Sequence, residues 1–256
     1  PVESPLDAGD PDRVRGAAEA GGEVSLKDYL FYEEPGITLY CADCREVLPL
    51  LERSADVVVT DPPYGSGLST AFHERFTREA GSWWKNTDTS TCTRHAPVIG
   101  DQEPFDPSPL LDLAAKLVFW GANWYSSRLP DSGGWLVWDK RHKVEGAAWP
   151  MSAAELAWTN LFSSVRMFRH MWFGLLRESE QGEHLHPTQK PVALMAWSLV
   201  QAKLDPKSLV LDPYCGSGPT LVAAKSLGHG AIGIEIESQY CEITVKRLRQ
   251  EVLTFP

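Results

Sequence analysis

The fold is decided by the stretch SLVLDPYCGSGPTLVAAKSLGHGAIGIEI, residues 208–236. Apolar runs separated by a glycine-bearing turn and by Gly228 predict alternating strands and helices. The predicted elements are strand 208–211, turn 212–218, helix 219–227, strand 230–236 and a final helix 239–253. A strand–helix–strand unit pairs its strands in parallel and packs the helix across one face. The sequence therefore predicts an α/β fold with a mostly parallel sheet flanked by helices.

The turn of this unit has the features of a ligand site. Gly216 and Gly218 allow the backbone to approach a ligand closely at the start of a helix. Glu235 lies 17 residues after Gly218, at the end of the next strand. An acid there accepts hydrogen bonds from the ribose hydroxyls of an adenosine cofactor. Leu221 replaces the third glycine of a dinucleotide motif, and no phosphate-binding Gly-Lys-Ser/Thr follows. We therefore expect S-adenosyl-methionine, an adenosine cofactor without a pyrophosphate; a turn without a ligand is the alternative.

A second motif, Asp61-Pro62-Pro63-Tyr64, directly follows a β-branched run at 55–60 that predicts a buried strand. An exocyclic amine of a nucleobase is a poor nucleophile because its lone pair is delocalised into the ring. The Asp61 carboxylate and the Pro62 carbonyl can each accept one amino hydrogen, with the prolines keeping the backbone rigid. Tyr64 offers an aromatic face to a base rotated out of the duplex. The motif predicts methyl transfer to an exocyclic amine, although four such residues also arise by chance in proline-rich loops.

Together these motifs resemble those of the amino-DNA methyltransferases, the N6-adenine/N4-cytosine DNA methylase family. That family carries [Asp/Asn/Ser]-Pro-Pro-[Tyr/Phe] and Asp-Pro-Phe-x-Gly-Ser-Gly-Thr-Thr, which resemble residues 61–64 and 212–220 here. The catalytic motif comes first, as in the permuted β group, and HPTQKP at 186–191 resembles that group's segment near the methionine carboxylate. The resemblance is close over 37–64 and 184–250. It implies a Rossmann-like S-adenosyl-methionine-dependent methyltransferase fold with a small inserted DNA-recognition region.

The resemblance also implies the residues of the site. The implied catalytic residues are Asp61, Pro62, Pro63 and Tyr64. The implied cofactor-binding residues are Asp43, Cys44, Asp61, Thr188, Lys190, Asp212, Tyr214, Gly216, Ser217, Gly218, Thr220, Glu235 and Ile236. The product of the cofactor would be S-adenosyl-homocysteine. Pro219 stands where the family usually has threonine, and proline suits the first position of a helix, so we expect cofactor binding to be kept.

The expected substrate is the N6 amino group of adenine in DNA, methylated at a specific site after base flipping. The alternative is N4 of cytosine, whose enzymes more often carry Ser-Pro-Pro-Tyr. A nicotinamide-dependent oxidoreductase is disfavoured by the missing third glycine. A non-enzymatic DNA-binding module needs a helix-turn-helix or zinc motif, and neither is visible. Cys41 and Cys44 form a CxxC without a second pair, so we expect two small strand-end side chains and no metal.

The net charge of −10 is unusual for a nucleic-acid-binding protein, but acids concentrate near the N-terminus. We expect a flexible acidic tail at 1–25 and a single methyltransferase domain at 26–256, with candidate target-recognition segments at 68–108 and 139–184. The expected phosphate contacts are Lys140, Arg141, Lys143, Arg166 and Arg169. No run of apolar residues is long enough to span a membrane, so the expected location is soluble, intracellular and cytoplasmic. Beyond DNA, a homodimer and a cognate restriction endonuclease stay open as partners.

Other predicted elements are less regular. The expected strands are 37–40, 117–120 and 135–138, and a further element begins within 153–158. The expected helices are 45–53, 110–116 and 191–204. Pro49 weakens the first helix, whereas Pro191 suits the first turn of the last one.

Overall fold

The computed structural model of the protein describes residues 24–51, 55–65, 98–141, 152–173, 176–180 and 189–250. A sheet of nine strands runs through it in the order β1-β2-β11-β10-β3-β4-β6-β5-β7. The strands are β1 (Leu30–Glu34), β2 (Ile37–Cys41), β3 (Val57–Thr60), β4 (Lys116–Trp120), β5 (Trp135–Asp139), β6 (Ala154–Thr159), β7 (Val165–Arg169), β10 (Leu209–Asp212) and β11 (Gly230–Glu235). A separate pair is formed by β8 (Trp172–Phe173) and β9 (Leu176–Arg177).

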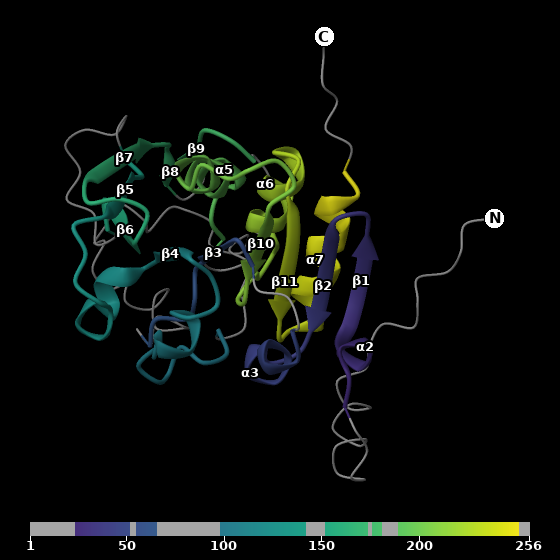
Figure 1. The fold of residues 1–256 in the computed structure, drawn as a ribbon. Helices are drawn as coiled ribbons and strands as arrows, with labels where there is room; N and C mark the ends of the chain where they lie inside the picture. The colour runs from purple at the N-terminus through teal and green to yellow at the C-terminus, as the bar shows by residue number, and fades with distance from the viewer. Residues whose placement is uncertain are drawn as a thin grey trace, which may run out of the picture.

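The sheet is mixed, with a parallel centre. The five strands β2, β11, β10, β3 and β4 are parallel neighbours, whereas β1 and β6 are antiparallel to the strands beside them. In Figure 1 the yellow-green β10 and β11 lie between β2 and β3, which come from the N-terminal part of the chain. The prediction of an α/β fold is confirmed, and the antiparallel strands β6 and β1 make the sheet mixed at its two sides.

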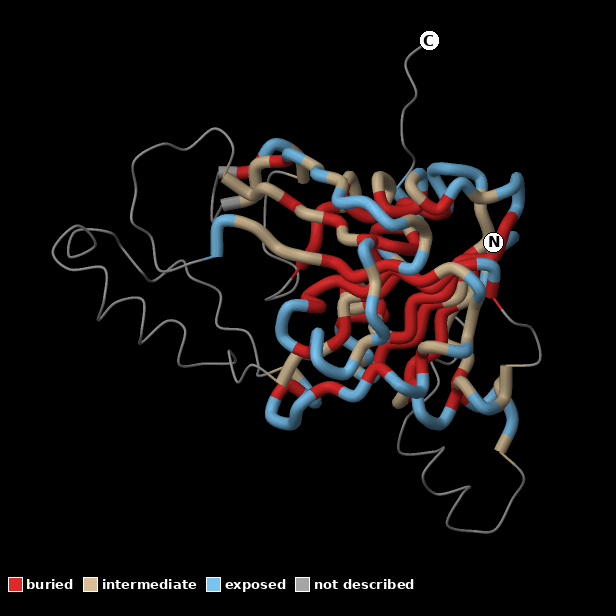
Figure 2. Tube along the Cα trace, turned by 60° about the vertical axis from the view of Figure 1, so that its left-hand side comes forward, coloured by how far each residue is buried: buried red, intermediate tan, exposed pale blue. Residues whose placement is uncertain are grey.

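Helices and loops cover both faces of the sheet centre. The helices are α2 (Leu26–Tyr29), α3 (Cys44–Val47), α5 (Val192–Gln201), α6 (Pro219–Ser226) and α7 (Ser238–Leu248). The 3₁₀ turns are η1 (Leu48–Leu50), η4 (Ser108–Leu110), η5 (Ala122–Trp124) and η6 (Ser126–Arg128). Successive strand residues point to opposite faces. Accordingly Val57 and Val59 pack in the core beneath α5, α6 and α7, whereas Val58 packs in a second core with α3 and Tyr125. Figure 2 shows the resulting buried band through the middle of the molecule.

Several predicted elements are confirmed within one to three residues, and one is wrong. The strands at 37–40, 117–120, 135–138, 208–211 and 230–236 and the helices at 191–204 and 219–227 are found. The helix expected at 110–116 is absent: this stretch contains the end of η4, a turn and the start of β4. The leucines that follow Pro107 and Pro109 pack in the second core from a turn instead.

The helix expected at 45–53 is much shorter, since α3 ends at Val47 and continues as the tighter turn η1 around Pro49. The strands β1 and β7, and the β8–β9 pair, were not expected.

Candidate active site

The sheet brings the predicted site residues to one edge. Because the five central strands are parallel, their carboxyl ends meet there, as in other open α/β sheets that bind ligands at this position. Asp61 follows β3, Asp212 ends β10, and Glu235 ends β11. The segments after β2 and β4 complete the edge. Thr60 and Asp212, 152 positions apart in the sequence, thus become neighbours.

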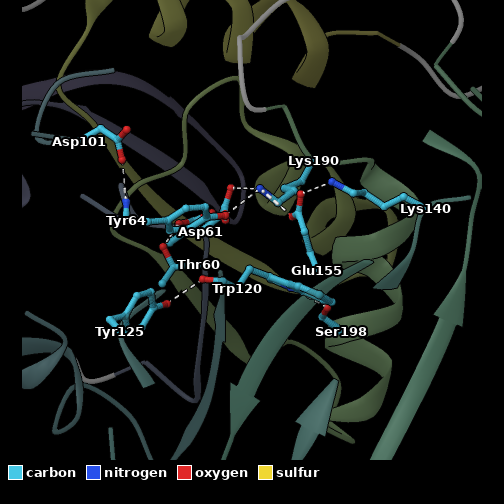
Figure 3. A network of polar contacts seen from close by, with 11 residues as sticks. Thr60, Asp61, Tyr64, Asp101, Trp120, Tyr125, Lys140, Glu155, Lys190 and Ser198 are labelled. Atoms are coloured by element: carbon cyan, nitrogen blue, oxygen red, sulfur yellow. Dashed lines mark hydrogen bonds and ion pairs between the residues drawn. The ribbon is translucent and has the colours of Figure 1, made fainter. Parts of the chain in front are cut away.

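At the end of β3, Asp61 is held by two side chains. Tyr64 donates its hydroxyl hydrogen to one carboxylate oxygen of Asp61, and the Lys190 ammonium donates to the other. Lys190 also lies 3.1 Å from the Tyr64 hydroxyl. Figure 3 shows the three groups converging from the loop after β3 and from the segment before α5. Burial raises the pKa of Asp61, and the charge of Lys190 acts in the opposite direction.

Lys190 belongs to a longer row of alternating charges. Its Nζ atom lies 3.3 Å from Glu155 on β6, and Glu155 in turn accepts from Lys140, 2.5 Å away. The Lys190 side chain is only 5% exposed, so its charge depends on these partners. Burial alone would raise the pKa of Glu155, but Lys190 and Lys140 lower it to about 2. The two carboxylates also raise the pKa of Lys190 against the effect of its own burial. Two anions and two cations therefore balance behind residues 61–65, which we call the catalytic loop after their predicted role.

The ring of Tyr64 is surrounded by other aromatic groups. It stacks on Trp124 at an interplanar angle of 8° and a centroid distance of 6.5 Å, and Tyr125 lies at the same distance on a tilted plane. Gly121, after β4, leaves room for the ring: a Cβ atom there would lie 1.9 Å from Tyr64 Cε1. Trp124 is 53% exposed. The catalytic loop therefore presents an aromatic surface beside a partly buried carboxylate.

The predicted cofactor loop adopts its expected strand–turn–helix form. Gly216 and Gly218 have φ angles of +52° and +74°, which favour glycine. Glu235 accepts the N–H groups of Gly216 (2.9 Å) and Glu237 (2.8 Å), so its carboxylate is fixed beside the loop. Burial raises the pKa of Glu235 to about 7, although these hydrogen bonds lower it.

Asp212 connects the two loops. Its Oδ1 atom accepts the hydroxyl hydrogen of Thr60 at 2.6 Å and the N–H of Tyr214 at 3.2 Å. Thr60 is the last residue of β3, directly before Asp61. Burial raises the pKa of Asp212 to about 6. The catalytic and cofactor loops are therefore joined by one side-chain hydrogen bond between adjacent strands.

The remaining predicted cofactor residues differ in where their side chains lie. Asp43 caps α3 and pairs with Arg45, Cys44 is buried, and Ile236 is exposed directly after Glu235. Ser217 and Thr220 are buried, and Ser217 accepts hydrogen bonds from Arg247. Their side chains therefore support the loop from within the protein. Thr188 lies outside the described residues.

The side chain of Lys140 is not at the protein surface, where a contact with a DNA phosphate would require it. Its side chain is 13% exposed, pairs with Glu155 and lies over the ring of Trp138, which corrects its expected role at the surface. Arg169 is exposed near Asp139, and Arg166 bonds Gln201 while covering Phe162. Arg141 follows β5, and Lys143 lies outside the described residues.

Two neighbours of the catalytic loop, Glu155 and Asp101, were not predicted. Glu155 is a single acid in the apolar run 153–158, a signal that could have marked it as an inward-facing charge. Asp101 contacts the loop from a turn 37 residues further on, and nothing in its local sequence distinguishes it. Both lie close to residues that the motifs did identify.

The described cysteines and helices can be compared with the requirements of a metal site and of a membrane span. Cys41 and Cys44 are both buried free thiols at the end of β2. Within the described ranges, no three His, Cys, Asp or Glu side chains are grouped to hold a metal ion. None of the helices in those ranges has the length and apolar character required to cross a bilayer.

Comparisons with known proteins agree with this geometry. A family model described as DNA methylase matches residues 132–246, which include Glu155, Lys190 and the cofactor loop. Type II methyltransferase M2.LlaDCHI of Lactococcus lactis subsp. cremoris is 26% identical over 270 residues, covering 90% of this chain and 95% of the relative. Type II methyltransferase M.HinfI of Haemophilus influenzae is 41% identical over 73 residues, which cover 28% of this chain and 20% of the relative.

A solved structure shares the fold. The PvuII DNA methyltransferase, described as cytosine-N4-specific, aligns with a TM-score of 0.52 at 13% identity, over 86% of this chain and 88% of that one. Such low identity supports the fold alone. The family match over residues 132–246, the relative of similar length and the arrangement of the motifs together make this chain similar to the N6-adenine/N4-cytosine DNA methylases.

Proposed function

We propose that the protein transfers the methyl group of S-adenosyl-methionine to the exocyclic N6 amino group of adenine, at a specific site in DNA. The observation that carries the proposal is the position of Asp61 and Tyr64 at the end of β3, joined through Thr60 to Asp212 on the next strand. This places a carboxylate and an aromatic ring directly beside the loop that resembles a cofactor site. The second product would be S-adenosyl-homocysteine.

The residues of the second loop fit the cofactor by their chemistry. S-adenosyl-methionine presents a ribose diol, an ammonium group and a sulfonium cation, which all suit anionic acceptors. The edge of the sheet supplies the carboxylates of Asp212 and Glu235, which among the described residues take part in none of the ion pairs. Glu235 would hold the ribose, Asp212 the methionine end, and Ile236 and Tyr214 the apolar parts.

The protein's own groups would prepare the amine. The cofactor supplies an electrophilic methyl group. Asp61 and the Pro62 carbonyl would accept the two amino hydrogens, so that the nitrogen lone pair is directed toward that methyl group. A carboxylate has about four acceptor positions, so Asp61 can accept an amino hydrogen in addition to its bonds with Tyr64 and Lys190. The nitrogen that gains the methyl group would lose one proton, and the Asp61 carboxylate would accept it.

Adenine is favoured over cytosine because the loop carries aspartate at position 61. The family resemblance associates Ser-Pro-Pro-Tyr more often with N4-cytosine enzymes. N4 of cytosine is therefore the second candidate. In either reaction the base would rotate out of the duplex and lie against Tyr64, and unstacking would cost a few kcal/mol.

DNA would be contacted by the segments 68–108 and 139–184. Among the phosphate-binding candidates, exposed Arg169 has the most suitable position, with Arg141, Lys143 and Arg166 nearby in the sequence. The full-length relative is a type II methyltransferase, and on that basis we include a cognate restriction endonuclease and a homodimer in the proposal.

Mass spectrometry of nucleosides from DNA treated with the protein and S-adenosyl-methionine tests the proposal. We expect N6-methyladenine, and we expect Asp61→Ala to lower the rate by about 10³-fold, at the upper end for one lost electrostatic contact. Asp112→Ala, at an exposed acid, is the matched control. N4-methylcytosine without N6-methyladenine would replace the first candidate by the second. No methylated base, with intact binding of S-adenosyl-methionine, would overturn both.

A further inference from the structure

The segment 98–105, which we call the clamp segment, lies against the catalytic loop. Gly65 and Gly100 have φ angles of +73° and +84°, which side chains rarely adopt. A Cβ atom on Gly65 would lie 2.4 Å from the backbone oxygen of Glu103, and one on Gly100 would lie 3.3 Å from Pro63 Cγ. The two backbones are therefore in close contact over several residues.

Asp101 makes the polar contact between them. Its Oδ1 atom accepts the backbone N–H groups of Tyr64 at 3.1 Å and Gly65 at 3.0 Å. Asp101 is only 5% exposed, and Figure 3 shows it directed at the backbone of Tyr64. Buried N–H groups require an acceptor, and one oxygen of Asp101 supplies it to both. Asp101 thus fixes the two peptide groups at which the chain leaves the catalytic loop.

The other end of the clamp segment reaches the cofactor loop. The ring of Phe105 packs edge-on against Tyr125 at 4.9 Å and against Tyr214 at 5.8 Å. The Phe105 carbonyl accepts a hydrogen bond from Arg128 at 3.0 Å. The clamp segment is therefore anchored on the side away from Asp101, so the Asp101 carboxylate has a fixed base from which to hold Tyr64.

We propose that Asp101 is a positioning residue for methyl transfer, an inference that rests on the proposed function. Asp101 acts through Tyr64: it holds the backbone that sets the position of the aromatic ring and of the hydroxyl bonded to Asp61. A displacement of about 1 Å at a reacting centre can lower a rate about 10²-fold. Asp101 is in neither of the two motifs, and it adds a third element to the catalytic centre.

Amide hydrogen exchange tests the contact without cofactor or DNA. In Asp101→Ala the N–H groups of Tyr64 and Gly65 lose their acceptor, and we expect the peptide over 57–65 to exchange about tenfold faster or more. In Asp101→Asn the amide oxygen can still accept both hydrogens, so protection should stay near the level of the unaltered protein. Unchanged exchange in Asp101→Ala would overturn the assignment, whatever reaction the protein catalyses.

Kinetics then test the positioning role. We expect Asp101→Ala to lower kcat about 10²-fold with the KM for S-adenosyl-methionine changed by about threefold or less, and Asp101→Asn to recover most of the loss. Asp106→Ala is the matched control, since Asp106 also accepts a backbone N–H but is exposed and outside the loop. Equal loss in Asp101→Asn and Asp101→Ala would overturn the proposal.

A milder variant covers the case in which Asp101→Ala does not fold. Gly100→Ala keeps the carboxylate but places a Cβ atom against Pro63, so the clamp segment must shift by a few tenths of an ångström. We expect a several-fold fall in kcat. Gly228→Ala has a similar φ angle of +76° with open space around the new atom, and it controls for backbone strain. Equal rates in the two glycine variants would contradict the proposal, whereas an unaltered protein without methylation activity would count against the proposed function alone.

Discussion

The catalytic loop and the cofactor loop begin alike and differ in their electrostatics. Each starts with an aspartate at the carboxyl end of a buried parallel strand, and the two strands are neighbours. Asp61 is paired with Lys190, which Glu155 and Lys140 support from behind. Asp212 and Glu235 instead accept hydrogen bonds from a hydroxyl and from backbone N–H groups, and burial raises their pKa values to about 6 and about 7.

One edge of a sheet can therefore hold two kinds of carboxylate. An acid that must stay in place through a reaction has its counter-charge built into the protein. Acids that lack such a partner are costly to ionise, and a ligand with cationic and donor groups lowers that cost when it binds. The arrangement predicts that the first loop depends on protein charges and the second on its ligand.

The largest expected effect comes from removing the counter-charge. Lys190→Met leaves Asp61 without its cation and Glu155 with Lys140 alone, and breaking such a buried pair costs about 3–5 kcal/mol of unfolding free energy. The pKa of Asp61 would rise further in the folded state. The loss should therefore be small near pH 5, where folded Asp61 can take up a proton, and grow as the pH rises toward 8.

Urea unfolding at pH 5 and pH 8 measures this difference. Lys246→Met, at an exposed position of α7, should change little at either pH. An equal loss of stability at both pH values in Lys190→Met would mean that Lys190 stabilises the fold through packing and not through its charge.

A steric change at the catalytic loop should be next in size. Gly121→Ala places a Cβ atom 1.9 Å from the ring of Tyr64, so the ring must move. We expect kcat to fall about 10²-fold, because the hydroxyl on Asp61 and the stacking surface move together. Steady-state methylation kinetics measure it, with the KM for S-adenosyl-methionine nearly constant. A wild-type kcat would show that Tyr64 need not stay in the observed position.

The smallest expected effect is on the cofactor loop. A ligand whose hydroxyls donate to Glu235 binds the ionised carboxylate, and that form is scarce below pH 7. The affinity for S-adenosyl-methionine should therefore rise with pH, with Kd about twentyfold larger at pH 6 than at pH 8, about tenfold from Glu235 and about twofold from Asp212. Isothermal titration measures the slope. Glu235→Gln should bind more weakly with only about a twofold change over this range, from Asp212. A steep slope that survives in Glu235→Gln would assign the titration to another group.

How far the sequence predicts the structure depends on where the signals lie. The strands and helix of 208–236 follow from local features, namely apolar runs, the glycines of the turn and a proline at the first helical position. The prediction of a helix at 110–116 was wrong because the leucines of this stretch pack in the core from a turn. That packing depends on tertiary contacts, which the local sequence does not show. The edge strand β7 alternates exposed and partly buried residues, but its sequence does not show that period of two, since Val165 and Met167 are apolar and exposed whereas Arg166 is charged and partly buried.

The site shows the same division. The motifs identified Asp61, Asp212 and Glu235, because each follows a strand in a recognisable pattern. They also led to Lys190, but as a cofactor contact, whereas the structure pairs it with Asp61. The further contact between Lys190 and Glu155 depends on β6 lying beside β4. Local patterns do not encode which strands become neighbours. The structure was therefore needed to identify Glu155 and Asp101 as residues of the site.

The sheet order also has a consequence for synthesis on the ribosome. When residue 205 has been made, β2 and β3 exist but are not neighbours, since the two strands that separate them, β10 and β11, are still to come. The nascent sheet therefore has a gap two strands wide, bordered by the apolar edges of Ile37–Cys41 and Val57–Thr60. Unpaired edges of this kind favour aggregation and recruit chaperones. The last βαβ unit supplies the two strands that join the halves of the sheet. A chain interrupted before this unit should therefore be degraded by the cell before it can act on any DNA.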